Sequence, residues 1–113
     1  MNTTLYPTTS RELASKRAQL APETAAAFKA FSQQVFAEGA LPVKIKQLIA
    51  VAVAHVTQCP YCIRGHTELA IKHGATQHAV MEANWVAAEM RAGGAYAHSN
   101  LALGTMNELQ PPA

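Results

Sequence analysis

Residues 41–66 read LPVKIKQLIAVAVAHVTQCPYCIRGH, and this stretch decides the fold class. Large and small residues alternate over 48–56, a pattern that a β-strand could also show. The small residues are alanines, which are the best helix formers and poor strand residues, so we predict a helix over 42–57. This helix is apolar on nearly all sides and is therefore expected to be central.

Prolines and glycines divide the rest of the chain into further helices. Prolines stand at the start and glycines at the end of successive runs of helix formers, which is the usual asymmetry of helices. Thr9 is expected to cap the first helix, with Glu12 completing a capping box. Helices are predicted over 9–19, 22–38, 42–57, 60–73, 76–92 and 95–108. The sequence therefore predicts an all-α fold of about six helices.

The composition favours one domain that assembles with copies of itself. A chain of 113 residues and 12.1 kDa corresponds to a single domain, spanning 1–113. Half of the residues are hydrophobic, but 23 of them are alanine, and Leu, Ile, Val and Phe together number only 23. Because large side chains for a core are scarce, we expect a homo-oligomer whose core is completed between subunits.

Charge and hydropathy exclude two classes of partner. Nine Lys and Arg against seven Glu give a net charge of +2, too even and too dispersed a balance for nucleic-acid binding. The longest apolar run, 48–54, is far shorter than the ~20 residues of a membrane-spanning helix. The N-terminal residues resemble no secretory signal, so we expect a cytoplasmic protein, in which a cysteine pair is more often catalytic or metal-binding than structural.

Residues 59–66, CPYCIRGH, are the strongest indication of chemistry. With Pro60 as the first helical residue, Cys59 occupies the N-cap and Cys62 lies in the first turn. Unpaired backbone N–H groups and the positive end of the helix dipole stabilise a thiolate there. The spacing allows a disulfide between the two cysteines. His66 lies one turn beyond Cys62 on the same face and can accept the thiol proton.

The Cys-x-x-Cys spacing also occurs in zinc sites and in glutaredoxins. A structural zinc needs four ligands, and the sequence has no second cysteine pair. The remaining potential ligands are His55, His73, His78 and His98. A glutaredoxin needs strands and a proline after the motif, whereas the next proline here is Pro111. Thiol–disulfide chemistry on a helical scaffold, without a metal or a resident cofactor, is therefore favoured.

Residues 41–66, together with Gly74-Ala75-Thr76 and Gly93-Gly94, resemble the alkylhydroperoxidase D-like branch of the carboxymuconolactone decarboxylase family. The likeness covers about 22–105, the expected core of the domain. It implies an all-helical fold that assembles into trimers or hexamers. It also implies a disulfide-exchanging, peroxide-reducing activity in members that keep both cysteines. An external dithiol, such as a lipoyl group, or a partner redox protein would supply the electrons.

The sequence departs from the family pattern at Gln47, where the family's proton relay has a glutamate. An amide can hydrogen-bond to His66 and orient it, but it cannot accept a proton or offset the charge of an imidazolium. We therefore expect weaker activation of the thiols than the family pattern implies, or help from another group. His55, two turns beyond Gln47, is one such group.

The predicted oxidoreductase uses Cys62 as the thiolate that attacks a hydroperoxide, and Cys59 as the thiol that resolves the resulting sulfenic acid. The reverse order stays open, because the N-cap position favours Cys59 as the more acidic thiol. Two other functions also stay open. One is a decarboxylase-like lyase activity on a small lactone, and the other is a non-catalytic thiol redox sensor.

Overall fold

The computed structural model describes residues 5–110, and every regular element in this range is an α-helix. The helices are α1 (Arg11–Leu20), α2 (Pro22–Val35), α3 (Val43–Thr57), α4 (Pro60–Lys72) and α5 (Gln77–Leu109). The all-α class is confirmed, and the stretch 48–56, where a strand was the alternative, lies within α3.

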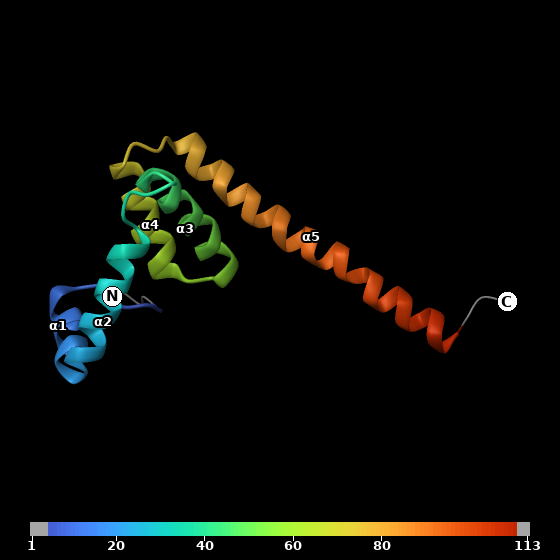
Figure 1. The fold of residues 1–113 in the computed structure, drawn as a ribbon, viewed down its shortest axis with the longest axis horizontal. Helices are drawn as coiled ribbons and strands as arrows, with labels where there is room; N and C mark the ends of the chain where they lie inside the picture. Colours follow the sequence, from blue (N-terminus) through green and yellow to red (C-terminus); the bar gives the residue numbers. More distant parts are fainter. Residues whose placement is uncertain (1–4, 111–113) are drawn as a thin grey trace.

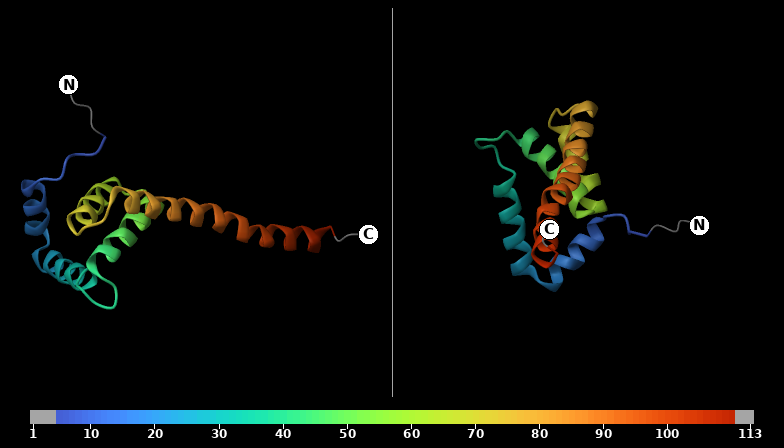
Figure 2. Two further views of the ribbon diagram at one scale, coloured as in Figure 1. Left: turned by 90° about the horizontal axis from the view of Figure 1, so that it is seen from above. Right: turned by 90° about the vertical axis from the view of Figure 1, so that its right-hand side faces the viewer.

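The helices form two groups. Helix α3 lies against α4 and against the first part of α5, while α1 pairs with α2. The α1–α2 pair joins the other group through the connection that follows α2, and most of α5 extends away from both groups (Figures 1 and 2). Helix α3 is therefore central, as its apolar sequence predicts.

A short connection joins α3 to α4. Helix α3 ends at Thr57, and its C-cap residue Gln58 has a left-handed backbone (φ 59°, ψ 47°) that changes the direction of the chain. Cys59 follows as the N-cap of α4, and Pro60 is its first residue. Because only two residues separate α3 from α4, the helices lie side by side and can hold residues of one site between them.

Helix α5 is continuous where two helices were predicted. Gly93 and Gly94 indicated a helix end after residue 92, but the helix runs through both to Leu109. Each glycine costs ~1 kcal/mol relative to alanine, and the alanine-, leucine- and methionine-rich flanks offset this cost. The prediction of about six helices was therefore wrong at this point, because the two helices predicted over 76–92 and 95–108 are one helix. At the other end of the chain, Ser10 and not Thr9 is the N-cap of α1, accepting the N–H of Leu13 at 3.2 Å.

The core of the described residues is small. Val51, Ala70 and Ala75 are buried together, with Leu48 and Val80 packed against them. Val51 is the only large side chain among residues 5–110 that is fully buried. This limited core agrees with the scarcity of large aliphatic residues in the sequence.

The outer part of α5 contributes nothing to this core. No residue of 88–110 is buried, and residues 92–107 contain no Lys, Arg, Asp or Glu. Its large apolar side chains are between 52% and 83% exposed: Met90, Tyr96, Leu101, Leu103, Met106 and Leu109. The radius of gyration is 19.9 Å, against about 13 Å for a compact chain of this length. Among the described helices, none combines the length and apolarity that crossing a bilayer requires.

Candidate functional site

The cysteine pair forms the first turn of α4. Cys59 is the N-cap, and its sulfur accepts the backbone N–H of Cys62 at 3.2 Å. A disulfide joins Cys59 to Cys62, and their Cα atoms are 5.2 Å apart. The ring of Tyr61, between them, meets Tyr6 edge to face with centroids 5.8 Å apart. The structure thus shows the site in its oxidised form, with both sulfurs at the positions that the sequence predicts.

The electrostatic setting of this turn favours negative sulfur. The first turn of α4 contains no acidic side chain, so nothing within it neutralises the positive end of the helix dipole. A thiolate formed there on reduction is stabilised by this dipole and by N–H groups of the first turn. Arg64 is exposed and has no hydrogen bond to the cysteines. Within the first turn of α4, the groups that stabilise a thiolate are therefore those of the backbone.

Gln47 of α3 holds the imidazole of His66. Its side chain is buried, with 3% exposure, and its Oε1 lies 2.7 Å from Nδ1 of His66. An amide oxygen only accepts hydrogen bonds, so the proton of this bond belongs to Nδ1 of His66. In the neutral ring Nε2 is then the unprotonated, basic nitrogen. The predicted contact between Gln47 and His66 is present, and it determines which nitrogen can accept a proton.

An aromatic ring covers one face of the same imidazole. Phe36, the C-cap residue of α2, stacks on His66 with ring centroids 5.2 Å apart and planes 22° apart. His66 is therefore held at one edge by Gln47 and on one face by Phe36. The ring has two independent contacts that fix its orientation.

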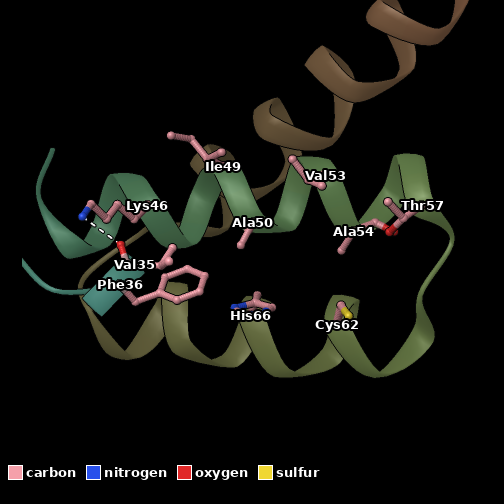
Figure 3. A pocket seen from close by; sticks show the side chains of 10 residues that line it. All are labelled: Val35, Phe36, Lys46, Ile49, Ala50, Val53, Ala54, Thr57, Cys62 and His66. Carbon is pink, nitrogen blue, oxygen red and sulfur yellow. Dashed lines mark hydrogen bonds between the residues drawn. The ribbon is translucent and has the colours of Figure 1, made fainter. Parts of the chain in front are cut away.

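Cys62 and His66 open into one cavity of about 390 Å³. Both project from α4 toward α3, with Phe36 beside the imidazole (Figure 3). The lining is mainly apolar and comes from the end of α2, from α3 and from α4: Val35, Phe36, Lys46, Ile49, Ala50, Val53, Ala54, Thr57, Cys62 and His66. Cys59 is not part of this lining. The two cysteines of the disulfide thus differ in access, since a molecule in the cavity meets only Cys62.

Other predicted residues lie outside this arrangement. His55 does not line the cavity, and its Nδ1 lies 2.8 Å from the carbonyl oxygen of Val51 on its own helix. His55 is thus engaged with its own helix and is not one of the groups that share the cavity with Cys62 and His66. Within residues 5–110, no three His, Cys, Asp or Glu side chains are grouped so that they could hold a metal ion.

Two residues of the site carry no sequence signal of their own. Phe36 lies 30 positions before His66, outside the motif. Lys46 belongs to the Lys-x-Lys-x-Leu-Ile-Ala run. Its ammonium group donates hydrogen bonds to the carbonyl oxygens of Val35 and Ala37 at the end of α2, and nothing in the run indicates this contact. Both contacts depend on the path of the chain between α2 and α3.

Comparisons with known proteins agree with this geometry. Residues 22–104 match the model of the carboxymuconolactone decarboxylase family. The chain is 64% identical over 83 residues to a Paracoccus denitrificans protein named "Uncharacterized protein 4 in cox locus", covering 74% of this chain and 75% of that protein. It is 32% identical over 91 residues to an uncharacterized protein of Cupriavidus necator, covering 80% of each.

Two solved structures share the fold. A protein from Methanobacterium thermoautotrophicum superimposes with a TM-score of 0.70 at 38% identity, over 74% of this chain and 93% of that one. A carboxymuconolactone decarboxylase family protein from Legionella pneumophila superimposes with a TM-score of 0.67 at 34% identity, over 70% of each chain. The chain is therefore a member of the carboxymuconolactone decarboxylase family, within the alkylhydroperoxidase D-like superfamily.

Proposed function

We propose that the chain is a thiol–disulfide oxidoreductase that reduces hydroperoxides. Cys62 is the attacking thiolate, His66 accepts its proton, and Cys59 resolves the oxidised intermediate. The observation that carries this proposal is the shared cavity, which Cys62 and His66 line and Cys59 does not. A hydroperoxide in the cavity reaches Cys62 first, which supports the order in which Cys62 attacks and Cys59 resolves.

The reaction begins from the reduced pair. His66 takes the proton of the Cys62 thiol through Nε2, and the thiolate attacks the terminal oxygen of the hydroperoxide. An S–O bond forms while the O–O bond breaks, and the alcohol leaves with the proton that His66 returns. Cys59 then attacks the sulfenic sulfur of Cys62, which forms the disulfide and releases water. The peroxide gains two electrons and the cysteine pair loses two.

An external dithiol returns these electrons. One of its thiolates attacks a sulfur of the disulfide to give a mixed disulfide. Its second thiol then closes a new disulfide and releases both cysteines reduced. A lipoyl-type dithiol, or the cysteine pair of a redox partner protein, has this property. The cycle uses no metal and no resident cofactor.

Gln47 gives specific support to a second function, that of a thiol redox sensor. The amide orients His66 but cannot stabilise its imidazolium form as a carboxylate would. The Cys62 thiolate is then formed less readily, and catalytic turnover is slower than with a carboxylate at this position. A disulfide that forms slowly and persists suits a sensor better than a peroxidase.

We also propose that the chain works as a homo-oligomer, a trimer or hexamer as its family resemblance implies. The exposed apolar side chains of α5 between residues 88 and 110 support this, because none of them is buried by the described part of the chain, residues 5–110. Burying such side chains is worth about 1.5–3 kcal/mol each. Light scattering coupled to size exclusion measures the subunit number directly, and a monomer at micromolar concentration would contradict the proposal.

A turnover experiment tests the proposed activity. The reduced protein is incubated with cumene hydroperoxide, with and without dihydrolipoamide, and peroxide loss is followed. Mass measurement after thiol alkylation reports the Cys59–Cys62 disulfide. Repeated consumption with dithiol present, and a single equivalent without it, supports the peroxidase. Disulfide formation without repeated consumption supports the sensor, and neither disulfide nor consumption overturns both.

A further inference from the structure

Lys46 ties the end of α2 to α3. Its ammonium group donates one hydrogen bond to the carbonyl oxygen of Val35 at 2.8 Å and another to that of Ala37 at 2.7 Å. The last turn of α2, which ends at Val35, contains no basic side chain of its own. Carbonyl groups at a helix C-terminus carry partial negative charge, so Lys46 supplies the cation that this end lacks.

The two carbonyl groups belong to the residues on either side of Phe36. The backbone around Phe36 is further held by two hydrogen bonds: its own N–H bonds to the carbonyl oxygen of Ser32 at 3.1 Å, and the N–H of Ala37 bonds to that of Gln34 at 3.4 Å. Lys46 thus holds the 35–36 and 37–38 peptide groups, and the N–H of Ala37 holds the 36–37 peptide group between them. Fixing these groups around Phe36 fixes the direction in which its side chain leaves the backbone. Lys46 therefore sets where the Phe36 ring lies relative to α3.

That ring lies on His66, as the stacking distance of 5.2 Å shows. A single hydrogen bond at Nδ1 would leave the imidazole able to tilt about the bond to Gln47. A second contact on the face of the ring removes this tilt. Edge and face together define the plane of the imidazole, and so define where Nε2 points.

We propose that Lys46 is a positioning residue for the redox site, acting through Phe36 on His66. Consecutive residues of α3 then hold the same imidazole by two routes, Gln47 directly at its edge and Lys46 indirectly at its face. The consequence for the rate of thiol chemistry rests on the proposed function. The effect of Lys46 on the environment of His66 does not.

The charge of Lys46 is not expected to act on the sulfur itself. Two of the three donors of its ammonium group are directed to main-chain carbonyl groups of the 35–37 segment. The role is thus one of geometry, and a side chain that keeps both hydrogen bonds should replace it. Arginine has donors enough to do so, whereas methionine keeps the length of the side chain and removes the donors.

NMR of the histidine rings tests the inference in the full-length chain. The stacked Phe36 ring shields the ring protons of His66, whose signals are assigned by their absence in His66→Asn. Lys46→Met and Phe36→Leu are both expected to lose this upfield shift, and Lys46→Arg to keep most of it. Lys44→Met, an exposed lysine near the start of α3, is the matched control and should leave the signals unchanged.

The same variants are compared by the rate of Cys62 alkylation with iodoacetamide in a Cys59→Ser background. Lys46→Met should lower the rate about tenfold, because a displaced imidazole accelerates the reaction less even though its chemistry is unchanged. Lys46→Arg should restore it. Circular dichroism confirms that each variant is folded.

Unchanged His66 signals in a folded Lys46→Met, or equal losses in Lys46→Met and Lys44→Met, would overturn the inference. Failure of the wild type to consume peroxide would instead overturn the proposed function. In that case the NMR comparison still decides the role of Lys46.

Discussion

Oε1 of Gln47 accepts a hydrogen bond from the Nδ1–H of His66 across 2.7 Å, so α3 holds the imidazole of α4 through an amide. The amide orients the ring in every protonation state that keeps this proton. It does not stabilise the imidazolium that forms when the ring gains a second proton, as a carboxylate does. The atom present at this buried position therefore determines how strongly the ring can support a thiolate.

Gln47→Glu is expected to speed the reaction of Cys62 at and below neutral pH by roughly tenfold. A carboxylate beside His66 stabilises the imidazolium, and the imidazolium stabilises the Cys62 thiolate, so the thiolate persists to lower pH. The midpoint of the profile of alkylation rate against pH should move to lower pH. Gln34→Glu, on the exposed side of α2, is the control. A profile that does not move would show that residue 47 has no part in thiol activation.

Replacing each cysteine in turn is expected to change peroxide consumption in different ways. Cys62→Ser should abolish peroxide consumption, because the attacking sulfur is gone. Cys59→Ser should still consume one equivalent of peroxide and accumulate a sulfenic acid that dimedone traps on Cys62. Mass measurement of the trapped product gives the site. Full consumption by Cys62→Ser, with none by Cys59→Ser, would reverse the assigned order.

Filling the cavity should separate substrates by size. Ala50 lies on α3 and lines the cavity opposite Cys62 and His66 (Figure 3). Ala50→Leu should raise KM for cumene hydroperoxide about tenfold, a typical effect of a few carbon atoms in an apolar pocket. Hydrogen peroxide needs little of the space and should be consumed as before. Equal losses of activity with both peroxides would mean that the substitution disturbs the reacting groups and does not act through the volume of the cavity.

Charge on the outer part of α5 should dissociate the proposed oligomer. Leu101 and Tyr96 are 70% and 83% exposed in the single chain. Leu101→Glu buries a carboxylate if this surface is an interface, at a cost of several kcal/mol. Sedimentation velocity should then show smaller species than the wild type, while Arg91→Glu, at a position already charged, serves as the control. An unchanged sedimentation coefficient for Leu101→Glu would place the interface elsewhere.

The sequence predicts the local parts of this site well. The start of α4 follows from Pro60, the position of Cys59 follows from that start, and the face of His66 follows from helical spacing. Even the contact between Gln47 and His66 was expected from the family pattern. Each of these depends on residues close together in the chain or on one recognised motif.

The remaining features depend on long-range packing. The stacking of Phe36 on His66 requires the turn between α2 and α3 to bring two distant segments together, and no periodicity indicates this. The continuity of α5 through Gly93 and Gly94 depends on a balance between a local penalty and the helix-forming flanks. His55 had a suitable spacing from Gln47, but its ring bonds to Val51 of its own helix. Spacing along one helix does not show which of its side chains contact the neighbouring helix.

The cavity wall formed by Val35 and Phe36 comes from the α1–α2 pair, whereas the sulfurs and the imidazole come from α4. One part of the cavity wall thus belongs to a different packing unit from the reacting groups, while the rest comes from α3, which packs against α4. Changes at Val35 alter the shape of the cavity, whereas changes at Phe36 also alter the surroundings of the imidazole. Related chains could diverge in the molecules they admit while the reacting groups stay the same.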